Sequence, residues 1–102
     1  MPCAMSVSVE WWGPVEVPDR IKRKVTRLVQ SLGPVLNEYE ANLFDMTNRA
    51  ASGFEYLMPK IELTLPLYEE GLTFKLRMLR LDHTQIFIET RDGDAVGEVF
   101  LE

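Results

Sequence analysis

One segment of this 102-residue chain repeats its apolar residues with the period of an α-helix, whereas most other segments alternate with a period of two. Within residues 18–32, apolar side chains recur at spacings of four, three, one and three, which lines one helical face. Pro18 and Asp19 suit a helix start, and Gly33 and Pro34 suit its end. We therefore predict one amphipathic helix with the buried face Ile21, Val25, Leu28, Val29 and Leu32.

Six further segments read as β-strands because apolar and polar residues alternate along them. Pro66 cannot donate to a strand ladder, so we expect its strand to lie at a sheet edge or to end at Pro66. We also expect a β-bulge near Met78 and a free edge, open to strand addition, on the last strand. The predicted strands are Ser6–Trp12, Val35–Thr47, Leu57–Leu67, Leu72–Leu81, Thr84–Arg91 and the segment running to Glu102.

The dipeptide Asp92-Gly93 is a strong signal for a two-residue hairpin turn. Folding the chain about this turn collects apolar residues, including Ala95, on one face of the last two strands. The cross-strand pairs that this turn predicts are Arg91 with Asp94, Ile88 with Gly97, and Ile86 with Val99.

These elements predict an α+β fold with the order β-α-β-β-β-β-β, in which one amphipathic helix packs on a mostly antiparallel, twisted sheet. The chain is short enough for one domain, residues 1–102, and 46% apolar with 26% charged residues is ordinary globular composition. We expect residues 1–4 to be frayed and residues 48–56 to form a mobile loop.

The residue inventory argues against catalysis and against a bound cofactor. Cys3 and His83 are the only cysteine and histidine, too few for a structural zinc site, and no disulfide can form within the chain. His83 lies in a predicted turn, and no phosphate-binding glycine loop occurs. We therefore expect no enzyme, no metal and no cofactor. The N-terminus lacks signal-peptide features and no apolar stretch could span a bilayer, so we expect a cytoplasmic protein without membrane contact.

Charge is distributed unevenly along the chain, whose net charge is −5. Five of the 11 bases fall within residues 20–27 of the predicted helix, which leaves a balance of −10 for the rest. Because the apolar face of this helix packs on the sheet, the bases must point to solvent. The bases that form the predicted basic helix face are Arg20, Arg23, Lys24 and Arg27.

Several large aromatic residues occupy the strand phase opposite to the predicted core. An antiparallel sheet covered on one face normally shows polar residues on the other. Large apolar groups there indicate a protein interface or a homodimer contact, unless the sheet buries both of its faces. The predicted partner-binding residues are Trp12, Phe44, Tyr68, Phe87 and Phe100.

Residues 6–78 resemble the ribosome hibernation factors. The resemblance rests on the run 13–18, on the helix residues Ile21, Val25 and Leu28 after it, and on the run 61–65. It implies a β-α-β-β-β-α fold that binds the small ribosomal subunit through basic helix surfaces. The positions to which this role would transfer are Arg20, Arg23, Lys24 and Arg27.

Three functional hypotheses follow. The leading one is a small non-catalytic protein-binding module, of the inhibitor, immunity or accessory-factor type, that acts through an acidic and aromatic sheet surface. The second is a ribosome- or nucleic-acid-associated factor that binds through helix residues 20–27, although the net charge of −5 disfavours nucleic acid. The third is a structural subunit of a homo-oligomeric assembly.

Overall fold

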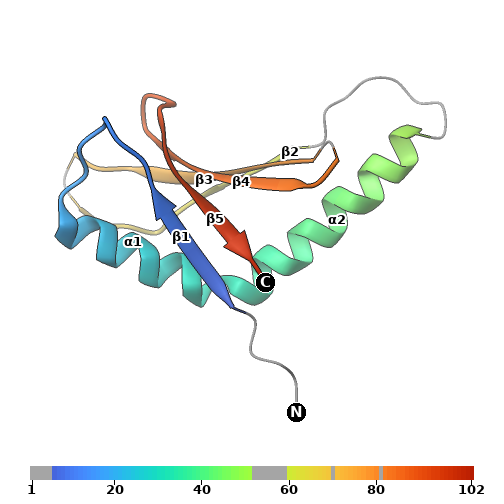
Figure 1. Cartoon of the computed structure of the whole chain (residues 1–102), viewed down its shortest axis with the longest axis horizontal. Coiled ribbons are helices and arrows are strands. Elements are labelled where there is room, and N and C mark those ends of the chain that lie inside the picture. Colours follow the sequence, from blue (N-terminus) through green and yellow to red (C-terminus); the bar gives the residue numbers. More distant parts are fainter. Residues whose placement is uncertain (1–5, 52–59, 70, 81) are drawn as a thin grey trace, which may run out of the picture.

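The computed structural model describes residues 6–51, 60–69, 71–80 and 82–102, and it confirms the α+β class (Figure 1). The chain forms a strand, two helices and then four strands. The predicted fraying of residues 1–4 and most of the predicted loop at 48–56 lie outside the described residues. The elements are β1 (Val7–Trp11), α1 (Asp19–Ser31), α2 (Gly33–Ala51), β2 (Lys60–Thr64), β3 (Phe74–Arg80), β4 (Thr84–Thr90) and β5 (Ala95–Leu101).

The five strands form one antiparallel sheet in the order β1-β5-β4-β3-β2. Both helices lie on the same side of this sheet (Figure 1). We call the opposite side the open face, because no helix of the described chain covers it. The expected free edge at β5 is wrong, since β5 pairs with β1 and with β4. The edges are β1 and β2, and Pro66 follows β2 as predicted.

Helix α1 follows the sequence prediction closely. Ile21, Val25 and Val29 are fully buried against the sheet, and the helix ends at Ser31. Leu32 then has φ −92° and ψ 6°, and the chain re-enters a helix at Gly33. The predicted stop is therefore a bend between two helices.

The predicted strand over residues 35–47 is wrong, because this segment belongs to α2. Leu36 and Leu43 are fully buried and lie seven residues apart, with half-buried Tyr39 between them, which is a helical spacing. The N–H of Leu36 donates to the carbonyl of Leu32 at 2.8 Å, so helical bonding crosses the bend. Pro34 is tolerated because a first-turn N–H has no helical partner to lose.

The residues of the predicted loop also change assignment. Positions 48–51 continue α2 instead of leaving it. At the other end of the chain, residues 95–101 form β5, where the resemblance to the ribosome hibernation factors implies a helix. The expected element order β-α-β-β-β-β-β therefore changes only at its third element, where a helix replaces a strand, and the fold class does not change.

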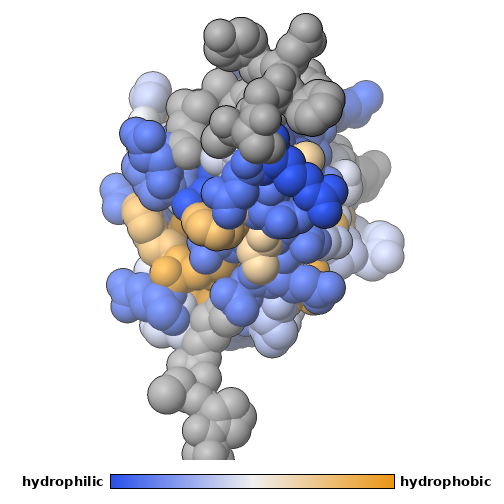
Figure 2. Space-filling model, turned by 90° about the vertical axis from the view of Figure 1, so that its right-hand side faces the viewer, coloured by the Kyte–Doolittle hydropathy of each residue, from blue (hydrophilic) through white to orange (hydrophobic). Residues whose placement is uncertain are grey.

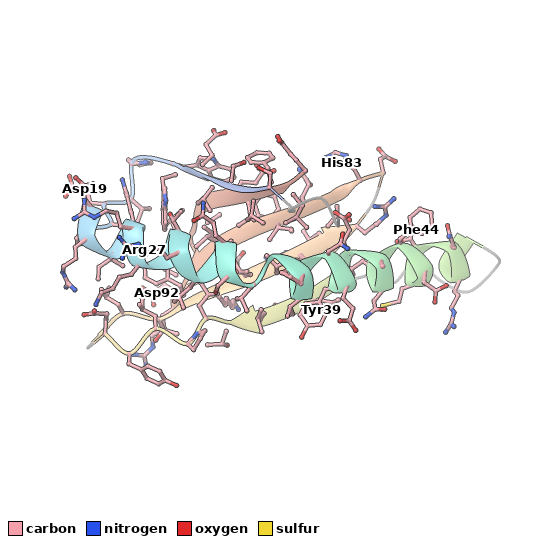
Figure 3. All side chains as sticks on the ribbon, turned by 90° about the horizontal axis from the view of Figure 1, so that it is seen from below. Asp19, Arg27, Tyr39, Phe44, His83 and Asp92 are labelled. Carbon is pink, nitrogen blue, oxygen red and sulfur yellow. The ribbon has the colours of Figure 1, made fainter. Side chains whose placement is uncertain are left out.

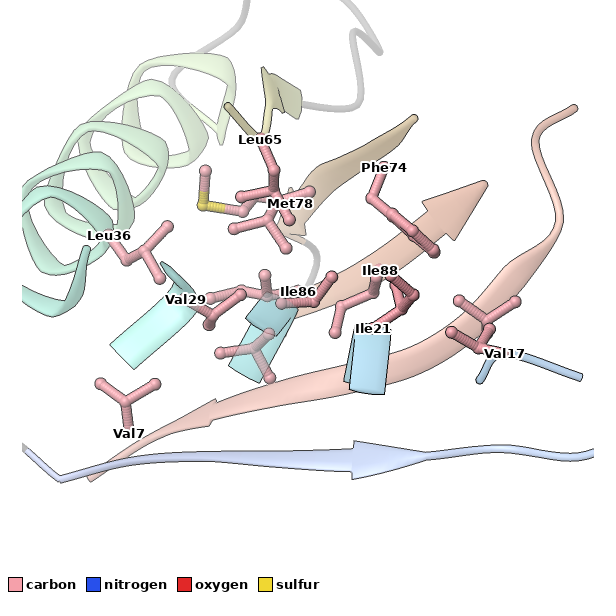
Figure 4. Packing of buried hydrophobic residues seen from close by; sticks show 14 of the residues in the cluster. Val7, Val17, Ile21, Val29, Leu36, Leu65, Phe74, Met78, Ile86 and Ile88 are labelled. Carbon is pink, nitrogen blue, oxygen red and sulfur yellow. The ribbon is translucent and has the colours of Figure 1, made fainter. Parts of the chain in front are cut away.

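The core lies between the helices and the sheet (Figure 4). Phe74, Leu76 and Met78 of β3 face the helices, and Ile86 and Ile88 of β4 pack beside them. Both helices contribute to the same buried cluster. One apolar layer therefore holds α1, α2 and the sheet together.

No helix of the described ranges is long and apolar enough to cross a membrane.

The last hairpin confirms two predicted cross-strand pairs and contradicts the third. Ile86 lies opposite Val99 and Ile88 opposite Gly97, but the N–H of Thr90 donates to the carbonyl of Asp94. The turn is therefore one residue longer than predicted, and Gly93 supports it with φ 87°. The register shifts between Ile88 and Glu89, whereas pairing is regular around Met78, where we expected the bulge. Because of this shift, Ala95 is exposed and Val96 is buried.

We expect Leu43→Ala to lower the free energy of unfolding by about 2–5 kcal/mol, because it removes a fully buried side chain that fixes α2 to the sheet. Urea denaturation followed by circular dichroism measures this change. The matched control is Asn42→Ala at the exposed neighbouring position, which should stay within about 0.5 kcal/mol of the parent. Equal stabilities of the two variants would contradict the helical assignment of this segment.

Candidate functional site

Three predicted partner-binding aromatics lie on the open face. Trp12 follows β1, Phe87 lies in β4 and Phe100 lies in β5. The rings of Trp12 and Phe87 contact edge to face, with centroids 5.9 Å apart. Phe100 is 38% exposed and the other two are half-buried. Because the alternate β4 residues Ile86 and Ile88 point into the core, these rings point away from it. We call the three residues the aromatic cluster.

A row of paired charges lies beside the aromatic cluster, where Arg77 is directly opposite Phe87. A nitrogen of Arg77 lies 3.2 Å from a carboxylate oxygen of Glu89, and Lys75 Nζ lies 4.0 Å from the other oxygen. Lys75 also lies 3.5 Å from Glu62. The two cations compensate the burial of Glu89, which is only 5% exposed. We call Glu62, Lys75, Arg77 and Glu89 the charged strip.

Two further carboxylates on the open face, those of Glu10 and Glu98, have no cation beside them among the described residues. Glu10 of β1 lies directly opposite Glu98 of β5. Both carboxylates are on the same sheet face as Trp12 and Phe100, each of which lies two residues further along the chain. Like charges in directly opposite positions repel each other. Neither carboxylate has an ion pair with any described residue. This pair therefore places unneutralised negative charge next to the aromatic cluster.

Phe44 lies in α2, on the helix side of the sheet, so the sheet separates it from the aromatic cluster (Figure 3). It was expected on the open face because its segment was predicted to be a strand. The guanidinium carbon of Arg80 lies 4.7 Å from the centroid of the Phe44 ring, which remains 50% exposed. Viewed from the end at which α2 terminates, the molecule shows hydrophobic side chains among hydrophilic ones (Figure 2).

Tyr68 also lies apart from the aromatic cluster. It belongs to the connection between β2 and β3 and is 96% exposed. The next residue, Glu69, binds Arg20 and Lys24 of α1, which places this connection beside the helix. Three of the five predicted aromatics therefore lie on the open face, and two of them, Trp12 and Phe87, are in ring contact.

All four residues of the predicted basic helix face are exposed on α1, but their partners differ. Arg20 donates to Glu69 at 3.1 Å, and Lys24 binds the same carboxylate oxygen. The hydrogen bond from Lys24 and, to a smaller extent, that from Arg20 hold the pKa of Glu69 below its ordinary value. Arg23 and Arg27 have no ion pair with any described residue. The single carboxylate of Glu69 thus engages two cations of the basic helix face and offsets one of its four positive charges.

A groove of about 490 Å³ runs between α1 and β1. The indole N–H of Trp11 donates to Thr26 at 3.2 Å, and Lys22 Nζ lies 6.0 Å from the centroid of the Trp11 ring. Arg23 and Arg27 line the same groove. We call it the α1–β1 groove. The sequence does not predict this groove, because strand alternation does not place Trp11 against particular side chains of the helix.

The predicted absence of catalysis and of metal binding stays a prediction. His83 is exposed in the connection between β3 and β4, and Cys3 lies outside the described residues. Within the part of the chain that the structure describes, no three His, Cys, Asp or Glu side chains are grouped so that they could hold a metal ion.

Comparison with known proteins gives no relative. No protein-family model, no curated protein and no solved structure matches the chain. The resemblance to the ribosome hibernation factors is therefore not supported by any of these comparisons. Functional proposals rest on the surface geometry described above.

We expect Lys24→Gln to raise the pKa of Glu69 toward its ordinary value, because the strongest hydrogen bond to the carboxylate is lost. A lowered carboxylate pKa stabilises the folded state above the unfolded pKa, and this contribution disappears as pH falls through the folded pKa. Carbon-detected NMR titration of the Glu69 carboxyl group measures the shift. Arg23→Gln, one position earlier and without an ion pair to the described residues, should leave the titration unchanged. The same pKa change in both variants would contradict the assigned contact.

Proposed function

We propose that this chain is a small non-catalytic binding module, of the inhibitor, immunity or accessory-factor type, which holds a protein partner against its open face. The observation that carries this proposal is the aromatic cluster on a sheet face without a covering helix in the described chain. A polar surface is the ordinary state of such a face, so three aromatic side chains there, two of them in ring contact, need another explanation.

The layout of the open face supports a protein ligand. Trp12 and Phe87 form an apolar centre, and the charged strip and the Glu10–Glu98 pair lie around it. Protein interfaces combine an aromatic-rich centre with a polar rim in the same manner. Because the two rings already contact each other, little side-chain freedom remains to be lost when a partner binds.

The charge of the open face favours a basic partner surface. Glu10 and Glu98 repel each other, so a lysine or arginine of a partner between them would relieve this repulsion. The balance of −10 outside the helix cluster adds long-range attraction for the same kind of partner. A basic surface on a nucleic-acid-binding protein has this chemistry.

Two alternatives remain as proposals of lower support. Ribosome or nucleic-acid binding through α1 is weakened because Arg20 and Lys24 are engaged with Glu69, which offsets one of their two positive charges. A homo-oligomer would bury the aromatic cluster of one copy against another. Molecular mass in solution distinguishes this last case from a heterologous partner.

We expect Trp12→Ala and Phe87→Glu to weaken partner binding, because each removes an aromatic group from the centre of the interface. Loss of a central aromatic costs about 2 kcal/mol or more, which is roughly a thirtyfold rise in Kd. Affinity capture from lysate of the source cells, with quantitative mass spectrometry, identifies the partner, and titration of the purified pair gives the Kd.

Tyr68→Ala is the matched control, since it removes an equally large exposed aromatic away from the open face. Thermal unfolding of each variant shows whether the fold is retained. Capture of RNA alone, or equal partner retention by the Trp12, Phe87 and Tyr68 variants, would refute the proposed function.

A further inference from the structure

The outer edge of β1 carries backbone groups that the sheet does not use. The N–H of Trp12 donates to β5 at one end of β1, and the carbonyl of Ser6 accepts from Glu102 at the other. Hydrogen bonding alternates along an antiparallel strand, so Val7, Val9 and Trp11 direct their N–H and carbonyl groups away from β5. β1 lies at the margin of the sheet (Figures 1 and 3). The edge can therefore accept one more strand.

A side-chain contact confirms the direction of these groups. Gln30 of α1 donates its amide hydrogen to the carbonyl of Val7 at 3.3 Å. This contact needs the Val7 carbonyl to point outward, toward the α1–β1 groove. This hydrogen bond also occupies the carbonyl of Val7. The backbone N–H and carbonyl groups that remain for pairing with another strand are therefore those of Val9 and Trp11.

The groove along this edge is locally cationic in an acidic protein. Lys22, Arg23 and Arg27 line it, and none has an ion pair with any described residue. Asp19 is the single acidic residue among its lining residues. The two cations on the opposite flank of α1, Arg20 and Lys24, are instead held by Glu69. The cations of α1 that have no ion pair with a described residue thus lie beside the outer edge of β1.

We propose that β1 and α1 together bind an extended acidic segment of another protein, which adds to β1 as a sixth strand. Its backbone pairs with Val9 and Trp11, and its helix-side acidic side chains reach Lys22, Arg23 and Arg27. Main-chain pairing provides affinity in such strand addition, and alternate side chains provide specificity. This proposal is independent of the proposed function, because it uses the sheet edge and the helix side instead of the open face.

Nucleic acid fits the same groove less well. Three cations give few phosphate contacts, and the net charge of −5 repels a long polyanion. A nucleic-acid backbone also cannot form the paired ladder of N–H and carbonyl groups that the β1 edge presents. An acidic peptide can form ion pairs with the three cations and can also pair its backbone with the outer edge of β1.

The test uses the full chain and a capped eight-residue peptide in which glutamate and valine alternate. We expect the backbone amide signals of Val9 and Trp11 and the Trp11 indole signal to shift on NMR titration, and the two backbone amides to become protected from hydrogen exchange. Combining Arg23→Gln with Arg27→Gln should raise the Kd roughly three- to tenfold, as expected for the loss of two exposed ion pairs. Arg91→Gln, an exposed cation in the β4–β5 turn, is the matched control and should leave the Kd unchanged.

Two further probes separate strand addition from simple attraction of charge. A peptide with lysine in place of glutamate, and a glutamate peptide whose alternate amides are N-methylated on the pairing edge, should both bind at least tenfold more weakly. The proposal is overturned if the glutamate peptide does not bind, if it binds without protecting the Val9 and Trp11 amides, or if either probe peptide binds equally well. Tighter binding of a single-stranded RNA oligonucleotide than of the glutamate peptide would overturn it as well.

Discussion

The bend between α1 and α2 determines which surfaces of this molecule are free. Because α1 stops at Ser31 and α2 starts at Gly33, the two helices lie in succession beneath the same side of the sheet. Ile21 and Val25 anchor the first helix in the common core, and Leu36 and Leu43 anchor the second. All apolar helix surface that the described chain buries is thus committed to one face, and the other face is left to the strands alone.

The remaining surfaces differ in charge and in the kind of ligand they suit. The open face presents the aromatic cluster, next to the opposed Glu10 and Glu98 carboxylates. The α1–β1 groove presents the positive charge of α1 that Glu69 does not neutralise. The charged strip is ordered around a buried Glu89 and stiffens the face on which the aromatic rings lie. The open face suits a basic partner, and the α1–β1 groove suits an acidic one.

The sequence predicts the fold class and α1 because these depend on local periodicity, and it predicts the pairs Ile86–Val99 and Ile88–Gly97 because a short turn restricts the register. It fails at residues 35–47, where Tyr39 and Leu43 fit both a period of two and a helical face, and only packing against the sheet decides between them. The prediction that Phe44 lies on the open face is wrong for the same reason. The grouping of Trp12 with Phe87 was recoverable from strand phase, whereas the β1 edge depends on the strand order, which alternation does not encode.

The central claim is that the aromatic cluster faces solvent while the opposite strand phase faces the helices. Solvent paramagnetic relaxation with a neutral gadolinium probe measures this directly, by comparing the ring protons of Phe87 and Phe100 with the methyl protons of Ile88 and Leu76. The account predicts strong relaxation enhancement at the two rings and almost none at the two aliphatic side chains, which are fully buried. Rings as protected from the probe as Ile88 and Leu76 would contradict it.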